Sequence, residues 1–370
     1  MKAVVFHGVG QIALDDVPEP EIQAPTDAIV RLTASAICGT DLHFVRGTVP
    51  GMKPGTILGH EGVGVIEEIG EDVCNLDVGD RVVIPSTIAC GACSYCRAGY
   101  YAQCDVANPN GAQAGTCFFG GPAETGPIQG LQAERARVPF ANVGLVKLPD
   151  GVSDEEAILL SDIVPTAYFG AKLAEIKSGD TVAVFGCGPV GQFCITSAKL
   201  LGAGRIFAVD NIPSRLAMAR AQGAEVIHFD EEDPVEALRR LTRGIGVDRA
   251  IDAVGVDANK AHHGPAAKRS KAEEQEIEHD RRAVTAAGKR PSGDNWHPGD
   301  APGQALEWAT AGLAKAGTLS IIGVYPTTAR FFPLGFAMNR NLTLRMGNCN
   351  HRKYIPRLVD MVEAGILEPT

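Results

Sequence analysis

The first 150 residues consist of short apolar runs interrupted by glycine and proline. The runs include "AVVF", "AIVRLTA", "GVGVIEEIG" and "GDRVVIP". Short apolar segments bounded by turn residues are typical of strands. The pattern therefore predicts a β-rich, barrel-like domain in this part of the chain.

A different pattern begins near residue 180. Compact runs such as "TVAVFG", "RIFAVD" and "AEVIHF" alternate with helix-like stretches such as "GQFCITSAKLLGA" and "PSRLAMARAQGA". Strands that alternate with helices form a parallel sheet covered by helices. Strand character returns in "TLSIIGVY" and "LTLRMGNC", and "YIPRLVDMVEAG" predicts one more amphipathic helix.

Segment 256–304 interrupts this alternation. It has almost no apolar periodicity and carries both charge signs in near balance. Charge-rich stretches usually bury too little apolar area to become ordered. We interpret the segment as a solvated insertion that forms a surface loop, and a flap over a cofactor or a contact between subunits is the alternative.

Length and charge narrow the class of protein. A chain of 370 residues exceeds what one hydrophobic core usually supports, so we expect two domains. The formal net charge of -10 disfavours nucleic-acid and membrane partners and favours a small-molecule substrate. The N-terminus has no signal-peptide core, and no apolar run reaches the roughly 18 residues of a membrane helix. We therefore expect a cytoplasmic protein.

Four of the ten cysteines, Cys90, Cys93, Cys96 and Cys104, lie close together. In a reducing compartment, metal binding explains such a cluster better than disulfides do. One loop can present these four thiolates tetrahedrally, which suits a structural zinc without an open coordination position. A redox pair needs only two cysteines, and a nucleic-acid zinc ribbon needs more basic surroundings than Arg97 supplies. Free thiols in a mobile loop are the remaining alternative.

A second set of candidate ligands occurs in "CGTDLH" and "GHEGVG", which supply Cys38, His60 and Glu61. A catalytic zinc has three protein ligands and an open position where it polarises substrate or water. Taken singly, a cysteine or a histidine is more often a buried structural residue. Together, and flanked by glycines, these residues predict an open, catalytic metal site.

The run "TVAVFGCGPVGQFCI" places Gly186, Gly188 and Gly191 between a strand-like and a helix-like segment. Glycines in that context let backbone N–H groups approach a dinucleotide pyrophosphate at the helix N-terminus. Asp210 ends the next strand, where an acid bonds the ribose 2′-hydroxyl and repels a 2′-phosphate. The pattern predicts NAD rather than NADP, although Arg215 partly offsets the repulsion.

The run "GHEGVGVIEEIGEDV", followed by "GDRV" and the cysteine cluster, resembles the zinc-dependent alcohol dehydrogenases of the medium-chain dehydrogenase/reductase family. The resemblance covers residues 1–255 and 305–370. It implies an α/β protein with a GroES-like, β-rich catalytic domain over 1–160. A Rossmann domain with a doubly wound parallel sheet would follow over 161–330 and contain the insertion. Residues 331–370 would return toward the catalytic domain, and we expect this part to be cut short, because relatives generally continue further.

The resemblance also implies a ligand set for the catalytic zinc. Cys38 and His60 would bind it, with Asp162 in "LLSDIVPTAYFGA" as the third ligand. Aspartate at this position looks like the branch that contains formaldehyde dehydrogenase. Glu61 would approach the metal or lie just behind it. The alternative for Asp162 is a hydrogen-bonding residue at a helix start.

Four more residues receive roles from the resemblance. Thr40 and His43 would pass the proton of the alcohol outward, in the way that a hydroxyl and an imidazole of near-neutral pKa can. Val190 would lie behind the nicotinamide ring, and Thr166 would touch the cofactor near its carboxamide. Val190 could instead be a core residue, Thr166 a helix residue, and Thr40 a strand or turn residue.

The resemblance thus implies an enzyme that transfers hydride between NAD and a small alcohol or aldehyde through a zinc-bound alkoxide, with formaldehyde favoured. It implies two zinc ions per chain, one catalytic and one structural, and a homo-oligomer, either dimer or tetramer. Within the class, a polyol or amino-alcohol dehydrogenase is the alternative. Outside it, the alternative is a zinc- and dinucleotide-binding relative without turnover.

Overall fold

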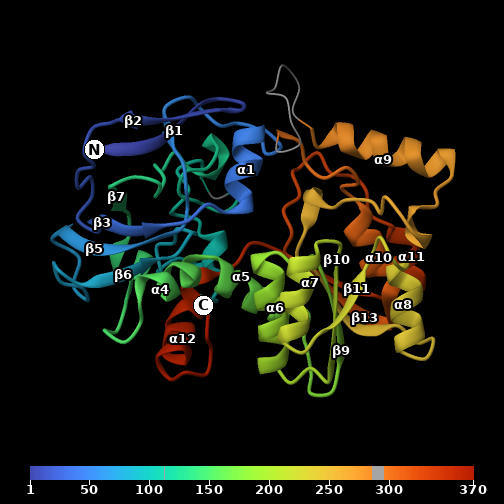
Figure 1. Ribbon diagram of the computed structural model, residues 1–370. Coiled ribbons are helices and arrows are strands. Elements are labelled where there is room, and N and C mark those ends of the chain that lie inside the picture. The colour runs from blue at the N-terminus through green and yellow to red at the C-terminus, as the bar shows by residue number, and fades with distance from the viewer. Residues whose placement is uncertain (112, 286–295) are drawn as a thin grey trace. The chain divides into compact units, whose positions relative to one another are not determined.

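The structure, a computed structural model, describes residues 1–111, 113–285 and 296–370 (Figure 1). These residues divide into two compact units. Unit 1 comprises the described residues of Met1–Thr166 together with Asn348–Thr370, and unit 2 comprises 167–285 and 296–347. Among the helices of the described ranges, none combines the length and the apolarity that crossing a bilayer requires.

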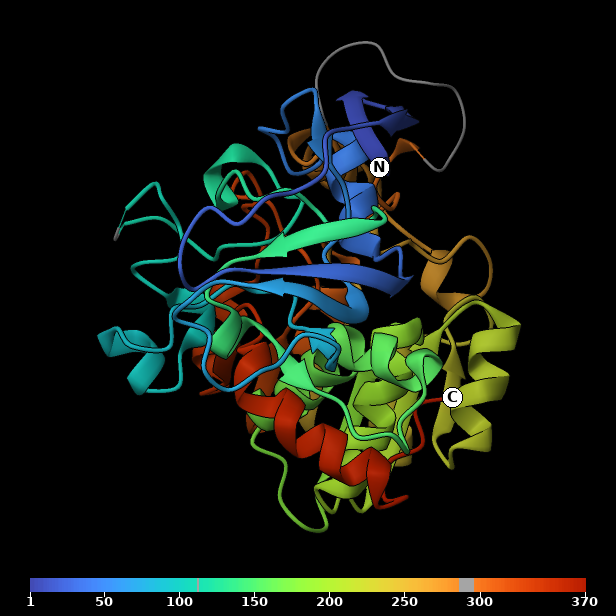
Figure 2. The same ribbon diagram turned by 90° about the vertical axis from the view of Figure 1, so that its left-hand side faces the viewer.

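Unit 1 is built on two antiparallel sheets, which Figure 2 presents from a second side. One sheet has the strand order β7-β3-β5-β6-β8 and the other the order β2-β1-β4. The strands are β1 (Lys2–Gly8), β2 (Gln11–Asp16), β3 (Ala28–Ser35), β4 (Thr56–Ile57), β5 (Gly62–Ile69), β6 (Arg81–Ile84), β7 (Arg135–Val138) and β8 (Val146–Lys147). The apolar runs of the first 150 residues form β1, β3, β5 and β6, so the predicted β-rich region is confirmed.

Short helices complete unit 1. They are α1 (Gly39–Arg46), α2 (Ser94–Arg97), α3 (Ala141–Gly144), α4 (Asp154–Ser161) and α12 (His351–Glu363), with the 3₁₀ turns η1 (Tyr101–Gln103) and η2 (Ala123–Thr125). Helix α5 (Ile163–Leu173) begins in unit 1 and continues into unit 2. Ser153 and Glu156 form a capping box that starts α4. The helix ends at Asp162, whose φ of -141° and ψ of -58° leave the helical range.

Unit 2 contains one parallel sheet with the order β11-β10-β9-β12-β13-β14. Numbered from β9, this is the order 3-2-1-4-5-6 of a Rossmann sheet, as predicted. Its strands are β9 (Thr181–Phe185), β10 (Arg205–Asp210), β11 (Glu225–His228), β12 (Val247–Asp252), β13 (Leu313–Ile321) and β14 (Thr343–Met346). Its further helices are α6 (Pro189–Leu200), α7 (Pro213–Ala221), α8 (Pro234–Leu241), α9 (Lys271–Ala283), α10 (Gln304–Gly312) and α11 (Leu334–Asn339), with the 3₁₀ turns η3 (Gly255–Asp257) and η4 (Pro265–Ala267).

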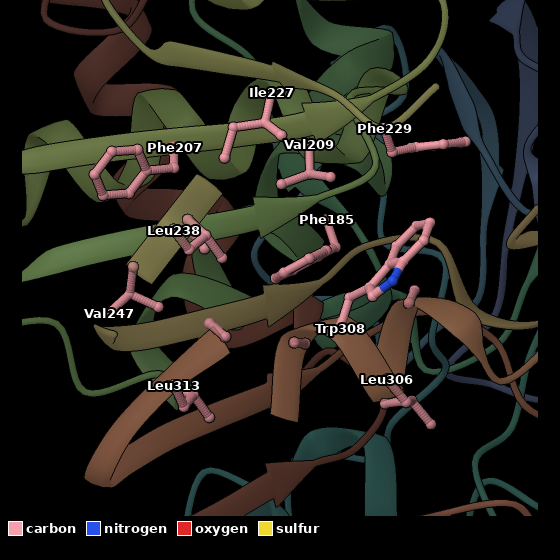
Figure 3. Close-up of a cluster of buried hydrophobic side chains, with 14 of the residues drawn as sticks. Phe185, Phe207, Val209, Ile227, Phe229, Leu238, Val247, Leu306, Trp308 and Leu313 are labelled. Atoms are coloured by element: carbon pink, nitrogen blue, oxygen red, sulfur yellow. The ribbon is translucent and has the colours of Figure 1, made fainter. Parts of the chain in front are cut away.

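Both faces of this sheet are buried. Val182 and Val184 of β9 join a cluster with residues of α5, α6 and α7, whereas Ala183 and Phe185 join a cluster with residues of α8 and α10. Figure 3 draws the second cluster, where the Phe229 and Trp308 ring centroids are 5.1 Å apart. Strands that are buried on both faces have continuous apolar sequences, and for this reason the strands of this sheet were predictable from the sequence alone.

The charged segment 256–304 is not simply a loop. Residues 286–295 of this segment lie outside the described part, but Lys271–Ala283 form α9, a helix without a buried residue. The expectation of a loop was therefore wrong at α9. Ser270 and Glu273 form a capping box, and Glu278 pairs with Arg282 one turn later. Local capping and strong helix formers specify this helix without an apolar stripe.

Candidate functional site

The four clustered cysteines converge on one point. Ligand atoms of Cys90, Cys93, Cys96 and Cys104 lie within 4.8 Å of one another. Cys93 caps α2 and Cys104 directly follows η1, so two short helical turns bring the sulfurs together. The arrangement is the four-thiolate geometry that suits zinc.

Backbone N–H groups are directed at these sulfurs. Cys104 accepts from the N–H of Cys90 at 3.3 Å and of Ala107 at 3.4 Å, and Cys90 accepts from the N–H of Cys93 at 3.4 Å. Burial raises the pKa of the Cys93 thiol, but the N–H groups of Cys96 and Asp105 lower it to about 7. The thiolate, which is the metal-binding form, is thus favoured at Cys93, whereas burial raises the pKa of the Cys96 and Cys104 thiols.

A second group brings together four residues from separate parts of unit 1. Ligand atoms of Cys38, His60, Glu61 and Asp162 lie within 4.8 Å of one another. The Cys38 sulfur is 3.7 Å from Asp162 Oδ2, and His60 Nε2 is 3.3 Å from the same oxygen. Sulfur, imidazole and carboxylate oxygen are the donors of a catalytic zinc.

Local structure explains how these side chains are placed. Cys38 is the N-cap of α1, and its N–H donates to Asp41 Oδ2 at 2.9 Å. His60 and Glu61 directly precede β5, while Asp162 ends α4. The group thus lies where two chain segments enter regular structure and a third leaves it.

A buried carboxylate orients the ring of His60. Its Nδ1 is 3.0 Å from Asp41 Oδ1, and both side chains are almost fully buried. Because the Asp41 carboxylate accepts, Nδ1 carries a hydrogen, and Nε2 is the ring nitrogen that faces Asp162 and Cys38. Asp41 Oδ2 also accepts from Gln132 Nε2 at 3.2 Å, which holds the carboxylate in turn.

The electrostatics of this group favour a cation. Burial raises the pKa of Asp162, but hydrogen bonds from His351 and His60 hold it well below its usual range. Burial and the charge of Asp162 raise the pKa of Glu61 to about 8. Among the described residues, Glu61 Oε1 is buried and has no hydrogen-bond partner. A buried acidic group with an unpaired oxygen fits a divalent ion placed among these donors.

The two predicted relay residues lie on α1. Thr40 is half-buried, with its hydroxyl 3.7 Å from the Cys38 sulfur. His43 follows three residues later and is buried. Residues three apart share a helix face, so Thr40 and His43 lie on the same face of α1.

The glycine motif of unit 2 has three distinct geometries. Gly186 has a φ of +86°, which favours glycine. A Cβ at Gly191 would lie 1.8 Å from the Gly186 carbonyl oxygen, whereas a Cβ at Gly188 would meet nothing within 4 Å. Gly186 thus forms a tight turn, Gly188 leaves open space at the N-cap of α6, and Gly191 allows a close contact between the helix and the turn. A dinucleotide-binding turn requires all three.

Asp210 is tied to this turn. Its carboxylate accepts N–H groups of Cys187 at 2.7 Å, Asn211 at 2.8 Å and Ile212 at 2.9 Å. Arg215 Nη1 is 3.8 Å away, close enough to compensate the charge in part. The acidic Asp210 and the basic Arg215 therefore lie close together just after β10.

The remaining predicted cofactor contacts lie in two different units. Val190 is half-buried in α6 and packs against the core cluster on that face of the sheet. Thr166 belongs to unit 1, and its hydroxyl donates to Asp162 Oδ1 at 2.7 Å. Their roles toward a nicotinamide stay predictions.

Comparison with known proteins identifies the family. The family described as alcohol dehydrogenase GroES-like domain matches residues 24–150, and that described as zinc-binding dehydrogenase matches residues 189–261. The uncharacterized zinc-type alcohol dehydrogenase-like protein AdhB of Bacillus subtilis is 38% identical over 373 residues, covering 100% of this chain and 91% of the relative. The chain belongs to the zinc-type alcohol dehydrogenases. The resemblance carried by the sequence motifs is confirmed, and so is the pairing of a GroES-like with a Rossmann domain.

Two further similarities refine this placement. Alcohol dehydrogenase TADH from a Thermus species has a TM-score of 0.78 and 36% identity, covering 100% of this chain and 90% of that chain. The glutathione-independent formaldehyde dehydrogenase of Pseudomonas aeruginosa is 38% identical over 273 residues, which cover 71% of this chain and 67% of the relative. The zinc-type alcohol dehydrogenase family is an oxidoreductase family, and the two groups able to hold zinc agree with the expected two ions.

Sequence reasoning missed two residues that hold the side chains of this group. Asp41, which orients His60, lies inside the quoted motif "CGTDLH", three residues after Cys38, and that spacing could have revealed it. His351, whose Nε2 is 2.6 Å from Asp162 Oδ1, begins α12 far away in the chain. No local pattern connects His351 with the metal ligands.

Proposed function

We propose that this zinc-type alcohol dehydrogenase is a zinc-dependent, NAD-linked enzyme that interconverts a small alcohol and its aldehyde. The observation that carries the proposal is the convergence of Cys38, His60, Glu61 and Asp162 within 4.8 Å. Four donors of this kind can leave one position for substrate when three of them bind a zinc ion. The four-cysteine group has no such spare position, and its proposed role is structural.

Zinc bound by this group would supply a Lewis acid that stabilises negative charge on the substrate oxygen, and NAD would accept the hydride. The residues of the chain perform the other tasks. By accepting from Nδ1, Asp41 keeps Nε2 of His60 directed at the group, where it would bind the ion. The Thr40 hydroxyl would take the proton of the substrate, and His43 would pass it to solvent. The alcohol thereby loses one hydride and one proton.

The Rossmann unit would hold NAD at the glycine turn. Gly188 leaves open space at the N-terminus of α6, where backbone N–H groups favour a pyrophosphate. Asp210 at the end of β10 favours a ribose 2′-hydroxyl over a 2′-phosphate. Arg215 weakens that preference, so both cofactors belong in the assay.

The favoured substrate is formaldehyde or another small aldehyde. Aspartate at position 162 supports this choice, as does the similarity to the formaldehyde dehydrogenase of Pseudomonas aeruginosa. A polyol or amino alcohol is the alternative within the class. A homo-oligomer and a cytoplasmic location stay predictions.

A substrate panel on one metal-analysed preparation tests the proposal. Hydrated formaldehyde, which would lose one hydride and one proton to give formic acid, is incubated with NAD and with NADP, and so are short primary and secondary alcohols, a polyol and an amino alcohol. Reduced cofactor is measured by absorbance. Two zinc ions per chain and chelator-sensitive formation of NADH support the enzyme. Binding of zinc and NAD without reduction of NAD by any substrate would instead identify a non-catalytic relative. Faster turnover with NADP would overturn the assignment of Asp210.

Replacing Thr40 by valine tests the proton relay. Valine keeps the shape of threonine but cannot accept or donate the proton, so turnover should fall on the order of 10²-fold, the lower end of what a positioned proton-transfer group contributes. Zinc content should not change, because zinc is bound by thiolate, imidazole and carboxylate groups and not by a threonine hydroxyl. Steady-state turnover and metal analysis check this, and near-normal turnover would reject the relay.

Replacing Cys96 by serine tests the four-cysteine group. Cys96 is buried, and its loss leaves three thiolates where zinc requires four. The variant should lose one zinc ion per chain and about 5 °C in Tm, the shift expected for roughly 2 kcal/mol in a domain of this size. Cys74→Ser is the matched control, since Cys74 is exposed and outside both groups. Unchanged zinc content in Cys96→Ser would contradict the structural site.

A further inference from the structure

The two carboxylate oxygens of Asp162 have different surroundings. Oδ2 faces the metal group, 3.3 Å from His60 Nε2 and 3.7 Å from the Cys38 sulfur. Oδ1 faces away and accepts from His351 Nε2 at 2.6 Å and from the Thr166 hydroxyl at 2.7 Å. One oxygen is therefore held by hydrogen bonds while the other remains available to an ion.

His351 is itself fixed from both sides of its ring. It is 2% exposed, and its Nδ1 is 3.0 Å from the Thr87 hydroxyl. The Ser86 hydroxyl lies 3.1 Å from Nε2 and 3.4 Å from the carbonyl oxygen of Ser161, the residue before Asp162. Because Asp162 accepts, Nε2 carries the hydrogen, and Nδ1 can accept from Thr87.

The segment that carries His351 is anchored on the four-cysteine loop. Asn350 Oδ1 accepts the N–H of Ala102 in η1 at 2.9 Å, two residues before Cys104. Asn348 Nδ2 donates to the Thr116 hydroxyl at 2.6 Å. The start of α12 is thus held at the position from which His351 reaches Asp162.

From this geometry we infer that His351 is a positioning residue, which holds Asp162 so that Oδ2 alone is presented to the metal. The inference rests on the proposed catalytic zinc site. A ligating carboxylate that lacks its outer hydrogen bonds can rotate or offer both oxygens, and loss of such a partner typically weakens metal binding by about 10–100-fold. His351 would thereby make the last segment of unit 1 part of the metal site.

Cobalt binding tests the inference separately from activity. Metal-free protein is loaded with Co²⁺, the metal is titrated against a chelator, and the visible spectrum of the thiolate-bound ion is recorded. The spectrum of Asp162→Ala, which keeps the four-cysteine group, is subtracted to isolate the ion bound with Cys38. We expect His351→Ala to bind this ion about 10–100-fold more weakly and with shifted bands. His351→Gln, which can place an N–H near the position of Nε2, should restore most of the affinity.

His7→Ala is the matched control. His7 also pairs with an aspartate, Asp15 at 2.8 Å, but it is exposed and lies outside the metal group. If His351→Ala does not fold, Thr87→Val keeps His351 but removes the partner of Nδ1, and a smaller loss of affinity is expected. If His351→Ala folds, a wild-type cobalt affinity and wild-type absorption bands in this variant would overturn the inference. If it does not fold, the same result in Thr87→Val would overturn it. No cobalt difference between wild type and Asp162→Ala would instead refute the proposed zinc site.

Discussion

Replacing Asp162 by alanine is expected to remove the metal ion of the Cys38 group and to reduce turnover by about 10³-fold or more. The carboxylate provides the oxygen that lies 3.3 Å from His60 Nε2 and 3.7 Å from the Cys38 sulfur. A Lewis acid contributes several kcal/mol to stabilising the charge that develops on a substrate oxygen, and each 1.36 kcal/mol is about tenfold in rate. Zinc per chain should fall from two to one.

A control variant on the same helix shows whether the loss of zinc is specific to Asp162. Glu155→Ala removes an exposed carboxylate from the same helix, α4, and should leave both zinc ions and turnover unchanged. Metal content by mass spectrometry and steady-state formation of NADH are measured on both variants. Two zinc ions per chain in Asp162→Ala would mean that Asp162 is not a ligand. One zinc ion with normal turnover would mean that the reaction does not use this metal.

Much of unit 2 was predictable because its signals are local. Strands such as β9 and β10 are continuous apolar runs, and the glycine turn lies between a strand and a helix within one short stretch. The same holds for the cysteine loop and for His60 with Glu61. In each case the residues that act together are close in sequence, so spacing alone carries the information.

The parts that were not predicted depend on distant contacts or, at α9, on a local capping signal that the prediction did not use. His351 meets Asp162 across 189 positions of the chain, and Thr87 meets His351 across 264. No periodicity encodes such a pairing, because it arises only when α12 packs beside α4. The prediction for α9 was wrong although its signal is local. A capping box and charged side chains specify this helix, whereas the prediction relied on apolar periodicity.

Replacing Gly191 by alanine should disrupt the dinucleotide turn itself. The added Cβ would lie 1.8 Å from the Gly186 carbonyl oxygen and 2.8 Å from its carbon, and both are backbone atoms that cannot rotate away. Helix α6 must then move off β9, at a cost of about 3 kcal/mol, the upper end for overpacking. We expect a lower Tm together with an NAD affinity reduced by at least about 10²-fold, since the N–H groups at the start of α6 no longer point at the pyrophosphate.

Two other glycine variants separate folding from binding in the same experiment. A Cβ at Gly188 meets nothing within 4 Å, so Gly188→Ala should keep the wild-type Tm and lose NAD affinity, because the methyl group would occupy the space where the pyrophosphate approaches. Gly335 in α11 also has free space, and Gly335→Ala should leave NAD affinity unchanged and should not lower the Tm, since alanine favours a helix over glycine. Thermal unfolding and calorimetric titration with NAD measure both quantities. Wild-type NAD affinity in Gly188→Ala would contradict the proposed pyrophosphate position, and a wild-type Tm in Gly191→Ala would contradict the close contact between α6 and the turn.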